Sequence, residues 1–184
     1  ILKLVPWLEL DRSVEKHDPD RDPRTIEAKP HLIALVFGQL FGLRSLREIE
    51  TNLRSHAGKL YHLGGQPISR EALRTANASA TRAEVFSAVL ESLMAQLQRG
   101  YRRKLDDCVR LIDSTSVQLN SLSEDWARFS AGVCGAKAHI IYDPDAEQPL
   151  YLMVTASNVN VITAAKTMRI EPGATYVFDL GYYD

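Results

Sequence analysis

The amino-acid sequence predicts an N-terminal all-helical domain followed by a domain of the α+β or α/β class. Apolar residues recur with helical spacing up to about residue 104, whereas later apolar runs are short and rich in β-branched and aromatic residues. The later part predicts the order strand, strand, strand, helix, strand. We therefore expect an arm or linker at 1–29, a basic helical domain at 30–104 and a second domain at 105–184.

The composition is that of a folded globular protein without a membrane segment. Of the 184 residues, 45% are hydrophobic and 24% are charged, a balance that argues against a disordered chain. The longest apolar run, from Leu32 to Phe37, is far shorter than the roughly 20 residues that cross a bilayer, and no signal peptide is evident. Cys108 and Cys134 lack metal-ligand spacing, so we expect reduced packing residues in a cytoplasmic protein rather than a disulfide.

The net charge of −1 conceals two parts of opposite sign. Residues 44–104 contain 11 Lys and Arg against 5 Glu, whereas residues 105–184 contain 5 Lys and Arg against 11 Asp and Glu. A basic part beside an acidic part favours polyanion binding next to a metal-holding site. The alternative is two solvated surfaces that differ in charge by chance.

The first 41 residues predict an arm followed by a helix. Apolar residues near the start give way to a polar stretch with turn-forming residues, so we expect an arm that docks through Trp7 and Leu8 or stays loosely ordered. Pro30 suits a first helical turn, and a largely buried helix is expected to run from it to about Phe41.

Two capping boxes predict where the next helices begin. Ser45-Leu46-Arg47-Glu48 predicts a helix at 45–55, and Thr81-Arg82-Ala83-Glu84 predicts the start of the longest helix. Between them we expect a loop at 56–67 and a short helix at 69–77. The longest helix carries one apolar stripe, which we interpret as a core face rather than a dimer seam. The stripe consists of Val85, Phe86, Val89, Leu90, Leu93, Met94 and Leu97.

The helical part is rich in arginine. A single exposed Arg is most simply a solvated surface residue, but the balance of 11 cations against 5 anions favours phosphate contact for the set. The helices at 45–55 and 69–77 loosely resemble a helix-turn-helix, although the loop between them is too long for the tight form. The candidate DNA-binding residues of this part are Arg44, Arg47, Arg54, Arg70, Arg74, Arg102, Arg103 and Lys104.

The acidic part changes to the shorter period of strands. Strands are expected at 109–117, 133–142, 149–156 and 175–180, with a helix at about 161–169. Asp143-Pro144-Asp145 predicts a hairpin turn. Lys137 and His139 alternate along a strand and so face one side, where they either contact DNA phosphate or form a polar strand face.

Two of these strands end in an aspartate. Asp113 follows Val109-Arg110-Leu111-Ile112, and Asp179 follows Thr175-Tyr176-Val177-Phe178. Each Asp either caps a turn or binds a metal, since hard cations such as Mg²⁺ prefer oxygen ligands. Two strands that present an Asp at the same end can place their carboxylates side by side, which favours the metal interpretation for the pair.

These motifs resemble the DDE-type transposases of bacterial insertion sequences, whose catalytic domain has an RNase H-like fold. The residues that carry the resemblance are Leu111-Ile112-Asp113-Ser114-Thr115, Gly135-Ala136-Lys137-Ala138-His139, Glu171-Pro172-Gly173-Ala174-Thr175-Tyr176 and the final run Tyr176–Asp184. The likeness extends from about Pro30 to the end, and it implies that the strand order is the first part, β-β-β-α-β, of that fold. In such a sheet the first and last of these strands are neighbours, so Asp113 and Asp179 meet.

The resemblance also implies roles. Asp113 and Asp179 become catalytic and metal-binding carboxylates for Mg²⁺, with Mn²⁺ as a substitute and two ions in the complete enzyme. The third carboxylate is implied to be a Glu on a later helix, and nothing after Asp184 is present to hold it. The chain therefore looks like a C-terminally truncated fragment, and we expect it to be nearly inactive in strand transfer alone.

The implied function is cut-and-paste DNA transposition. The full protein would cut the ends of its own element and join the 3′-hydroxyls to target DNA. It would act as a homo-oligomer on double-stranded DNA in the bacterial cytoplasm, associated with the nucleoid, and its helical domain would help to recognise the ends. Two alternatives are a non-transposing metal nuclease of the same fold and an inactive DNA-binding remnant.

Three other acidic residues are further candidates for the site. Glu171 precedes the second Asp and adjoins Pro172, so we do not assign it as the third carboxylate. Asp143 is expected to form a turn, and Asp184 lies close enough to Asp179 to line the same cleft. One position departs from the family, which commonly has an Asp where this chain has Val161.

Overall fold

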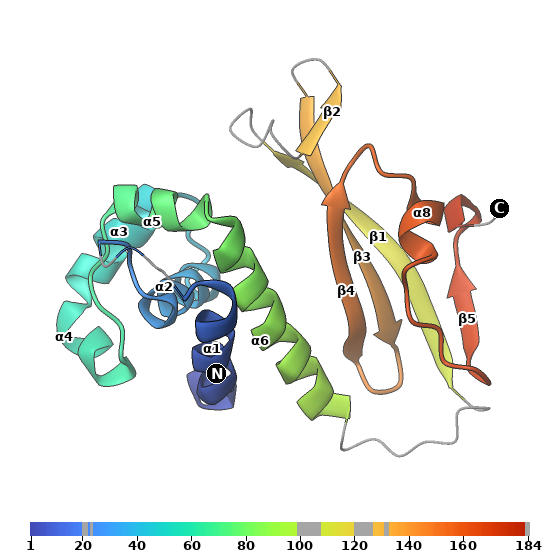
Figure 1. The fold of residues 1–184 in the computed structure, drawn as a ribbon, viewed down its shortest axis with the longest axis horizontal. Coiled ribbons are helices and arrows are strands. Elements are labelled where there is room, and N and C mark those ends of the chain that lie inside the picture. Colours follow the sequence, from blue (N-terminus) through green and yellow to red (C-terminus); the bar gives the residue numbers. More distant parts are fainter. Residues whose placement is uncertain (20–21, 23, 99–107, 120–126, 131–132, 183–184) are drawn as a thin grey trace. The chain divides into compact units, whose positions relative to one another are not determined.

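The computed structural model describes residues 1–184 except 20–21, 23, 99–107, 120–126, 131–132 and 183–184. The chain divides into two compact units, Ile1–Leu93 and Met94–Asp184. The first is helical, and the second is built on a mixed sheet (Figure 1). This is the α+β architecture that the sequence predicts, with a sheet consistent with part of an RNase H-like fold.

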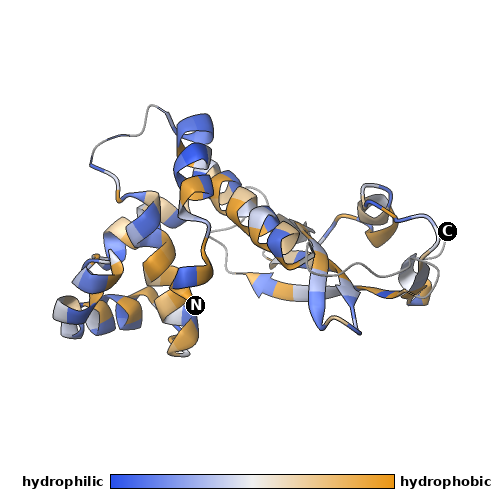
Figure 2. Cartoon of the chain, turned by 90° about the horizontal axis from the view of Figure 1, so that it is seen from below, coloured by the Kyte–Doolittle hydropathy of each residue, from blue (hydrophilic) through white to orange (hydrophobic). Residues whose placement is uncertain are grey.

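The helical unit consists of short helices and one long one. Its elements are η1 (Leu2–Leu4), α1 (Trp7–His17), α2 (Ala28–Leu40), α3 (Leu46–Ser55), α4 (Ala57–Leu60), η2 (Tyr61–Leu63), α5 (Arg70–Asn77) and α6 (Ala80–Gln98). Figure 2 shows both apolar and polar residues in the longer helices. In α3, for example, Ile49 and Leu53 are buried, whereas Arg54 is exposed.

The segment expected as an arm contains an 11-residue helix, α1. Its buried apolar residue is Leu10, which packs in a core cluster with Ala28, Val85 and Val89. Trp7 packs against the same cluster, whereas Leu8 is 64% exposed. The segment thus docks through one of its two expected anchors and through Leu10, because helical spacing places Trp7 and Leu10 on the same face. The same cluster buries the α6 residues Val85 and Val89, as expected of a core face.

The helix starts match the capping signals at one of two places. Ser45 precedes α3, and its hydroxyl accepts a hydrogen bond from the Glu48 amide at 3.2 Å, as predicted. The second prediction is wrong, because α6 begins at Ala80, before Thr81. Ser79 is the residue whose hydroxyl lies within hydrogen-bonding distance of the Arg82 amide, at 3.4 Å.

The predicted loop at 56–67 is also wrong in part, since α4 and η2 occupy most of it. Leu60 at the end of α4 is buried in a second core cluster together with Leu53 of α3 and Leu73 of α5. Burial of this leucine offsets the weak helix propensity of Gly58. Gly64 then ends the segment with a left-handed backbone, φ 73°.

Helix α2 follows the predicted span but is less buried at its end than expected. Ile33 and Ala34 are buried, whereas Leu40 and Phe41 are exposed. Phe41 instead stacks on Phe37, with ring centroids 4.3 Å apart, so that the two rings shield each other.

The sheet unit contains the predicted elements in their predicted order. These are β1 (Val109–Leu119), β2 (Arg128–Ser130), β3 (Val133–Asp143), β4 (Gln148–Ala156), α8 (Val161–Ala165), β5 (Thr175–Phe178) and η5 (Leu180–Tyr182). The short β2 was not predicted. The strand order is β2-β3-β1-β5, with β4 also paired to β3, and only the β1–β5 pair is parallel among the described pairs.

One face of the sheet is covered by the chain after β4. Ile112 of β1 and Ile141 of β3 are buried there against Met168 and Tyr182, which lie after α8 and in η5. The alternate positions of β1, Val109, Leu111 and Asp113, are exposed. Cys108 and Cys134 are both buried, as expected of packing residues. Within the described residues, no helix combines the length and apolar character that crossing a membrane requires.

Candidate functional site

The strand register brings the two predicted aspartates together. Strands β1 and β5 run parallel, and their paired residues extend from Val109 with Thr175 to Ile112 with Phe178. Asp113 and Asp179 are the next positions in this alignment: β1 continues through Asp113 to Leu119, whereas β5 ends at Phe178, directly before Asp179. Because neighbouring strands lie about 4.7–4.9 Å apart, the two aspartates lie side by side, although Asp113 lies within its strand and not at the strand end that the sequence predicts. Asp113 and Asp179, which are far apart in the sequence, are therefore neighbours in space.

Each aspartate also makes a local hydrogen bond. Asp179 Oδ1 accepts from the Gly181 amide at 3.0 Å, and Asp113 Oδ1 accepts from the Ser114 amide at 2.7 Å. Turn formation is therefore present at Asp179. Within the described part of the chain, Oδ2 of each carboxylate has no hydrogen bond, and both residues are exposed. One oxygen of each side chain remains accessible to a cation.

Tyr182 lies on the covered face beside the carboxylate pair, and sequence reasoning did not single it out. Its hydroxyl lies 3.3 Å from His139 Nδ1. Burial raises the pKa of the Tyr182 phenol, and the negative charges of Asp113 and Asp179 raise it further. Both carboxylates are thus close enough to act on the same hydroxyl.

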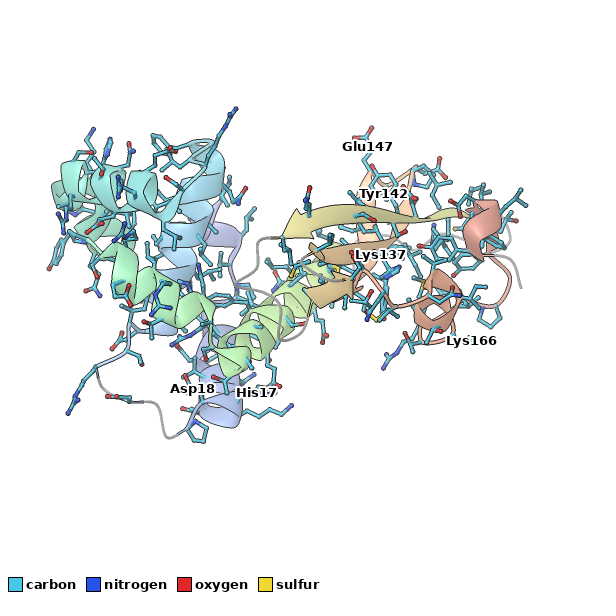
Figure 3. The ribbon with its side chains drawn as sticks, turned by 90° about the horizontal axis from the view of Figure 1, so that it is seen from above. His17, Asp18, Lys137, Tyr142, Glu147 and Lys166 are labelled. Atoms are coloured by element: carbon cyan, nitrogen blue, oxygen red, sulfur yellow. The ribbon has the colours of Figure 1, made fainter. Side chains whose placement is uncertain are left out.

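The side chain of His139, for which DNA contact and a polar strand face were the two expectations, is 0% exposed in the structure described. Its Nε2 lies 2.9 Å from the Thr155 hydroxyl of β4. Burial, followed by the charge of Lys137, lowers the pKa of His139. Lys137, labelled on β3 in Figure 3, is partly buried, and its Nζ donates to the Val159 carbonyl at 3.2 Å. The elements after β4 cover this face, so the strand's polar residues point inward.

An ion pair lies near the start of β1 and β5. Arg110 Nη1 donates to Asp143 Oδ2 at 2.8 Å, and both side chains are buried. Asp143 Oδ1 accepts from the amides of Asp145 and Ala146, so this residue forms the hairpin turn as predicted. Glu171, close before β5, lies 3.5 Å from Arg110 Nη2. The pair therefore links β1 to the β3–β4 turn and to the approach of β5.

The predicted DNA-binding arginines separate into paired and unpaired residues. Arg54 pairs with Glu50 at 2.7 Å, and Arg74 pairs with Glu71 at 2.6 Å. Arg44, Arg47 and Arg70 are exposed, and no ion pair of theirs occurs among the described residues. The predicted residues Arg102, Arg103 and Lys104, like Asp184 in the sheet unit, lie outside the described residues.

The groups of Asp113 and Asp179 that could bind a cation are carboxylate oxygens, which are hard ligands. Carboxylate oxygens suit Mg²⁺ and Mn²⁺, so Asp113 and Asp179 fit the ions that the sequence predicts. Within the described residues, no group of three or more His, Cys, Asp or Glu side chains is arranged to hold a metal. The described chain thus offers two carboxylates at this place and no third.

Comparison with known proteins agrees with this geometry. Residues 104–184 match the family described as "Transposase DDE domain", and residues 1–66 match "Domain of unknown function (DUF4372)". The sheet unit therefore matches the transposase DDE domain family over residues 104–184. It is similar to a protein of Sinorhizobium fredii (strain NBRC 101917 / NGR234) named "Putative transposase y4zB".

The likeness to that relative is 40% identity over 126 residues, which cover 68% of this chain and 35% of the relative. The matched part of the chain therefore spans about a third of the relative's length. No solved structure matches the chain.

Proposed function

We propose that this chain forms the end-binding part and the first part of the catalytic domain of a cut-and-paste DNA transposase. The observation that carries the proposal is the parallel β1–β5 register, in which Asp113 within β1 and Asp179 directly after β5 follow the last paired residues. The family of the sheet unit and the transposase relative support the same reaction class. The full protein would cut the ends of its element and join the 3′-hydroxyls to target DNA.

Asp113 and Asp179 would hold the divalent cation, Mg²⁺ or Mn²⁺, through their carboxylate oxygens. A bound pair of such ions activates an oxygen nucleophile and stabilises the leaving oxygen of an in-line phosphoryl transfer. The rigid sheet supports both carboxylates, which keeps the ligands in place without reorganisation during the reaction. A third carboxylate, from a Glu elsewhere in the complete protein, would finish the site.

The helical unit would bind double-stranded DNA through phosphate contacts. Arg44, Arg47 and Arg70 are exposed and outside the described ion pairs, so that their charges are available to a polyanion. Recognition of the element's ends, assembly of a homo-oligomer on DNA and action at the bacterial nucleoid belong to the same proposal.

The metal site is tested by titrating Mn²⁺ into the chain and into Asp113→Asn, with binding followed by calorimetry. Loss of an outer-shell partner of a metal ligand typically costs 10–100-fold in affinity, so loss of a ligand itself should cost about tenfold or more. Glu147→Gln is the matched control for charge. Glu147 projects from the β3–β4 turn (Figure 3) and is exposed, so this variant should bind Mn²⁺ as the unchanged chain does.

Equal affinity in all three proteins would contradict a metal site at Asp113. That result, together with retained DNA binding, would favour the inactive remnant over the transposase. One observation already fits the remnant: α8 begins with Val161, where the family commonly has an acidic residue, and this valine packs against the core of the sheet unit.

The DNA interface is tested by replacing Arg47 and Arg70 together with alanine and measuring the affinity for a DNA duplex at several salt concentrations. Each lost phosphate contact should lower the slope of log affinity against log salt by about 1, so the double variant should lose about 2. The double alanine variant of Arg54 and Arg74 is the control, because their glutamate partners already neutralise them.

Equal salt slopes for the two double variants would overturn this assignment of the arginines. A duplex that carries the element's inverted-repeat end separates the two enzyme functions. A transposase should bind that duplex more tightly than a random duplex, whereas a non-transposing nuclease should not distinguish them.

A further inference from the structure

We propose that Tyr182 is a positioning residue, whose hydroxyl fixes the turn after Asp179 against His139 of β3, beside β1, and so sets the separation of the two carboxylates. This inference rests on the proposed function, since the separation matters only if the carboxylates share cations.

The hydroxyl contacts one member of a residue pair held by the β1–β3 register. Ser114 and His139 are directly opposite each other in these antiparallel strands, so their side chains project from the same face. Tyr182 covers that face, is 9% exposed and packs with Ile112 and Ile141. Its hydroxyl lies 3.3 Å from Nδ1 of His139, the residue opposite Ser114.

The residues on both sides of the contact between Tyr182 and His139 lie next to one of the carboxylates: Ser114 is opposite His139, and Tyr182 is in the turn after Asp179. Ser114 directly follows Asp113 in β1. On the other side, the Tyr182 amide donates to the Asp179 carbonyl at 3.1 Å, and the Gly181 amide donates to Asp179 Oδ1 at 3.0 Å. Tyr182 therefore belongs to the hydrogen-bonded turn that orients the Asp179 side chain.

The pairing of β1 with β5 does not reach the aspartates. The paired residues of these two strands end with Ile112 and Phe178, one residue before each Asp. Asp113 is still held in the sheet by its pairing with Ile140 of β3, whereas Asp179 lies in the turn after β5. The contact of the Tyr182 hydroxyl with His139 attaches this turn to β3, and His139 is itself held by the contact of its Nε2 with the Thr155 hydroxyl of β4.

Gly181 has a specific part in this turn. A Cβ at position 181 would lie 3.1 Å from Asp179 Oδ1, closer than ordinary van der Waals contact. The glycine lets the turn close around the carboxylate without displacing it. The turn from Asp179 to Tyr182 is therefore closely packed, and a side chain at position 181 would disturb the Asp179 carboxylate.

The test is Tyr182→Phe, which keeps the buried ring and removes only the hydroxyl. We expect the Mn²⁺ affinity of the chain to fall by about tenfold, the low end of outer-shell effects, with little change in Tm. The matched control is Tyr176→Phe. The Tyr176 hydroxyl accepts a hydrogen bond from the Glu171 amide at 2.9 Å, away from the carboxylates, so its loss should leave Mn²⁺ affinity unchanged.

A second readout does not depend on metal. Amide hydrogen exchange of Gly181 and Tyr182, measured by NMR without added cation, should become faster in Tyr182→Phe and remain unchanged in Tyr176→Phe. A general loss of stability would instead accelerate exchange across the sheet, including at Ile141.

The outcomes separate this inference from the proposed function. Unchanged Mn²⁺ affinity in Tyr182→Phe, or an equal loss in Tyr176→Phe, overturns the role of the hydroxyl. If the unchanged chain binds no Mn²⁺, the proposed metal site fails, and exchange at Gly181 then decides the role of Tyr182. Unchanged exchange at that amide overturns the inference, and selectively faster exchange supports the attachment of the turn.

Discussion

Asp143→Ala should lower the free energy of unfolding of the sheet unit by about 3–5 kcal/mol, since it removes one partner of a buried ion pair. The side chains of Arg110 and Asp143 are 8% and 5% exposed, and Arg110 Nη1 lies 2.8 Å from Asp143 Oδ2. The substitution leaves Arg110 with Glu171, a half-exposed partner at 3.5 Å. It also removes the acceptor of the Asp145 and Ala146 amides.

The measurement is urea unfolding followed by NMR signals of the sheet unit, so that the helical unit does not contribute. Asp145→Ala is the control in the same turn; its side chain is exposed, and its effect should stay within about 0.5 kcal/mol. An equal effect of the two substitutions would show that the buried pair does not stabilise the sheet.

Leu73→Ala should lower the free energy of unfolding of the helical unit by about 2–5 kcal/mol. Leu73 is 0% exposed and packs with Leu53 and Leu60, so the substitution leaves a cavity where three helical segments meet. Incomplete collapse around such a cavity adds to the lost transfer free energy of the removed methyl groups.

Urea unfolding, followed by NMR signals of Leu53 and its neighbours, measures this effect. Leu63→Ala is the matched control, because Leu63 in η2 is exposed and should cost less than about 0.5 kcal/mol. A small effect of Leu73→Ala would show that the helical unit repacks readily and does not depend on this cluster.

Much of the sheet unit could be predicted because its strands carry their own signals. The β-branched runs before Asp113 and Asp179 predicted β1 and β5, and the Asp143 turn predicted the hairpin between β3 and β4. The short β2 at 128–130 was missed because three residues are too few for an alternating pattern. Its pairing is decided by contact with β3, not by local sequence.

The helical unit shows where tertiary contacts override local signals. Three glycines at 58, 64 and 65 predicted a loop, yet burial of Leu60 places a helix there. Thr81 had the correct capping partner three residues on, but Ser79 lies at the actual helix start. Both errors arise because a local pattern states what a segment can form, while packing selects one of the possibilities.

The aspartates of the candidate site could be predicted, but their surroundings could not. Asp113 and Asp179 each follow a short β-branched run. The resemblance to the transposase family predicted that their two strands are neighbours. His139 looked like an exposed polar residue because a strand pattern does not show which face later elements cover. Tyr182 carried no signal of its own, since its contact with His139 joins residues 43 positions apart.

The parallel alignment of β1 with β5 also determines which changes of length the protein can tolerate. Residues added between Ala165 and Thr175 would lengthen a connection and leave the alignment intact. A single residue lost within Thr175–Phe178 would instead turn the carboxylate of Asp179 toward the opposite side of the sheet. Related sequences should therefore vary in length before β5 and keep the number of residues within it.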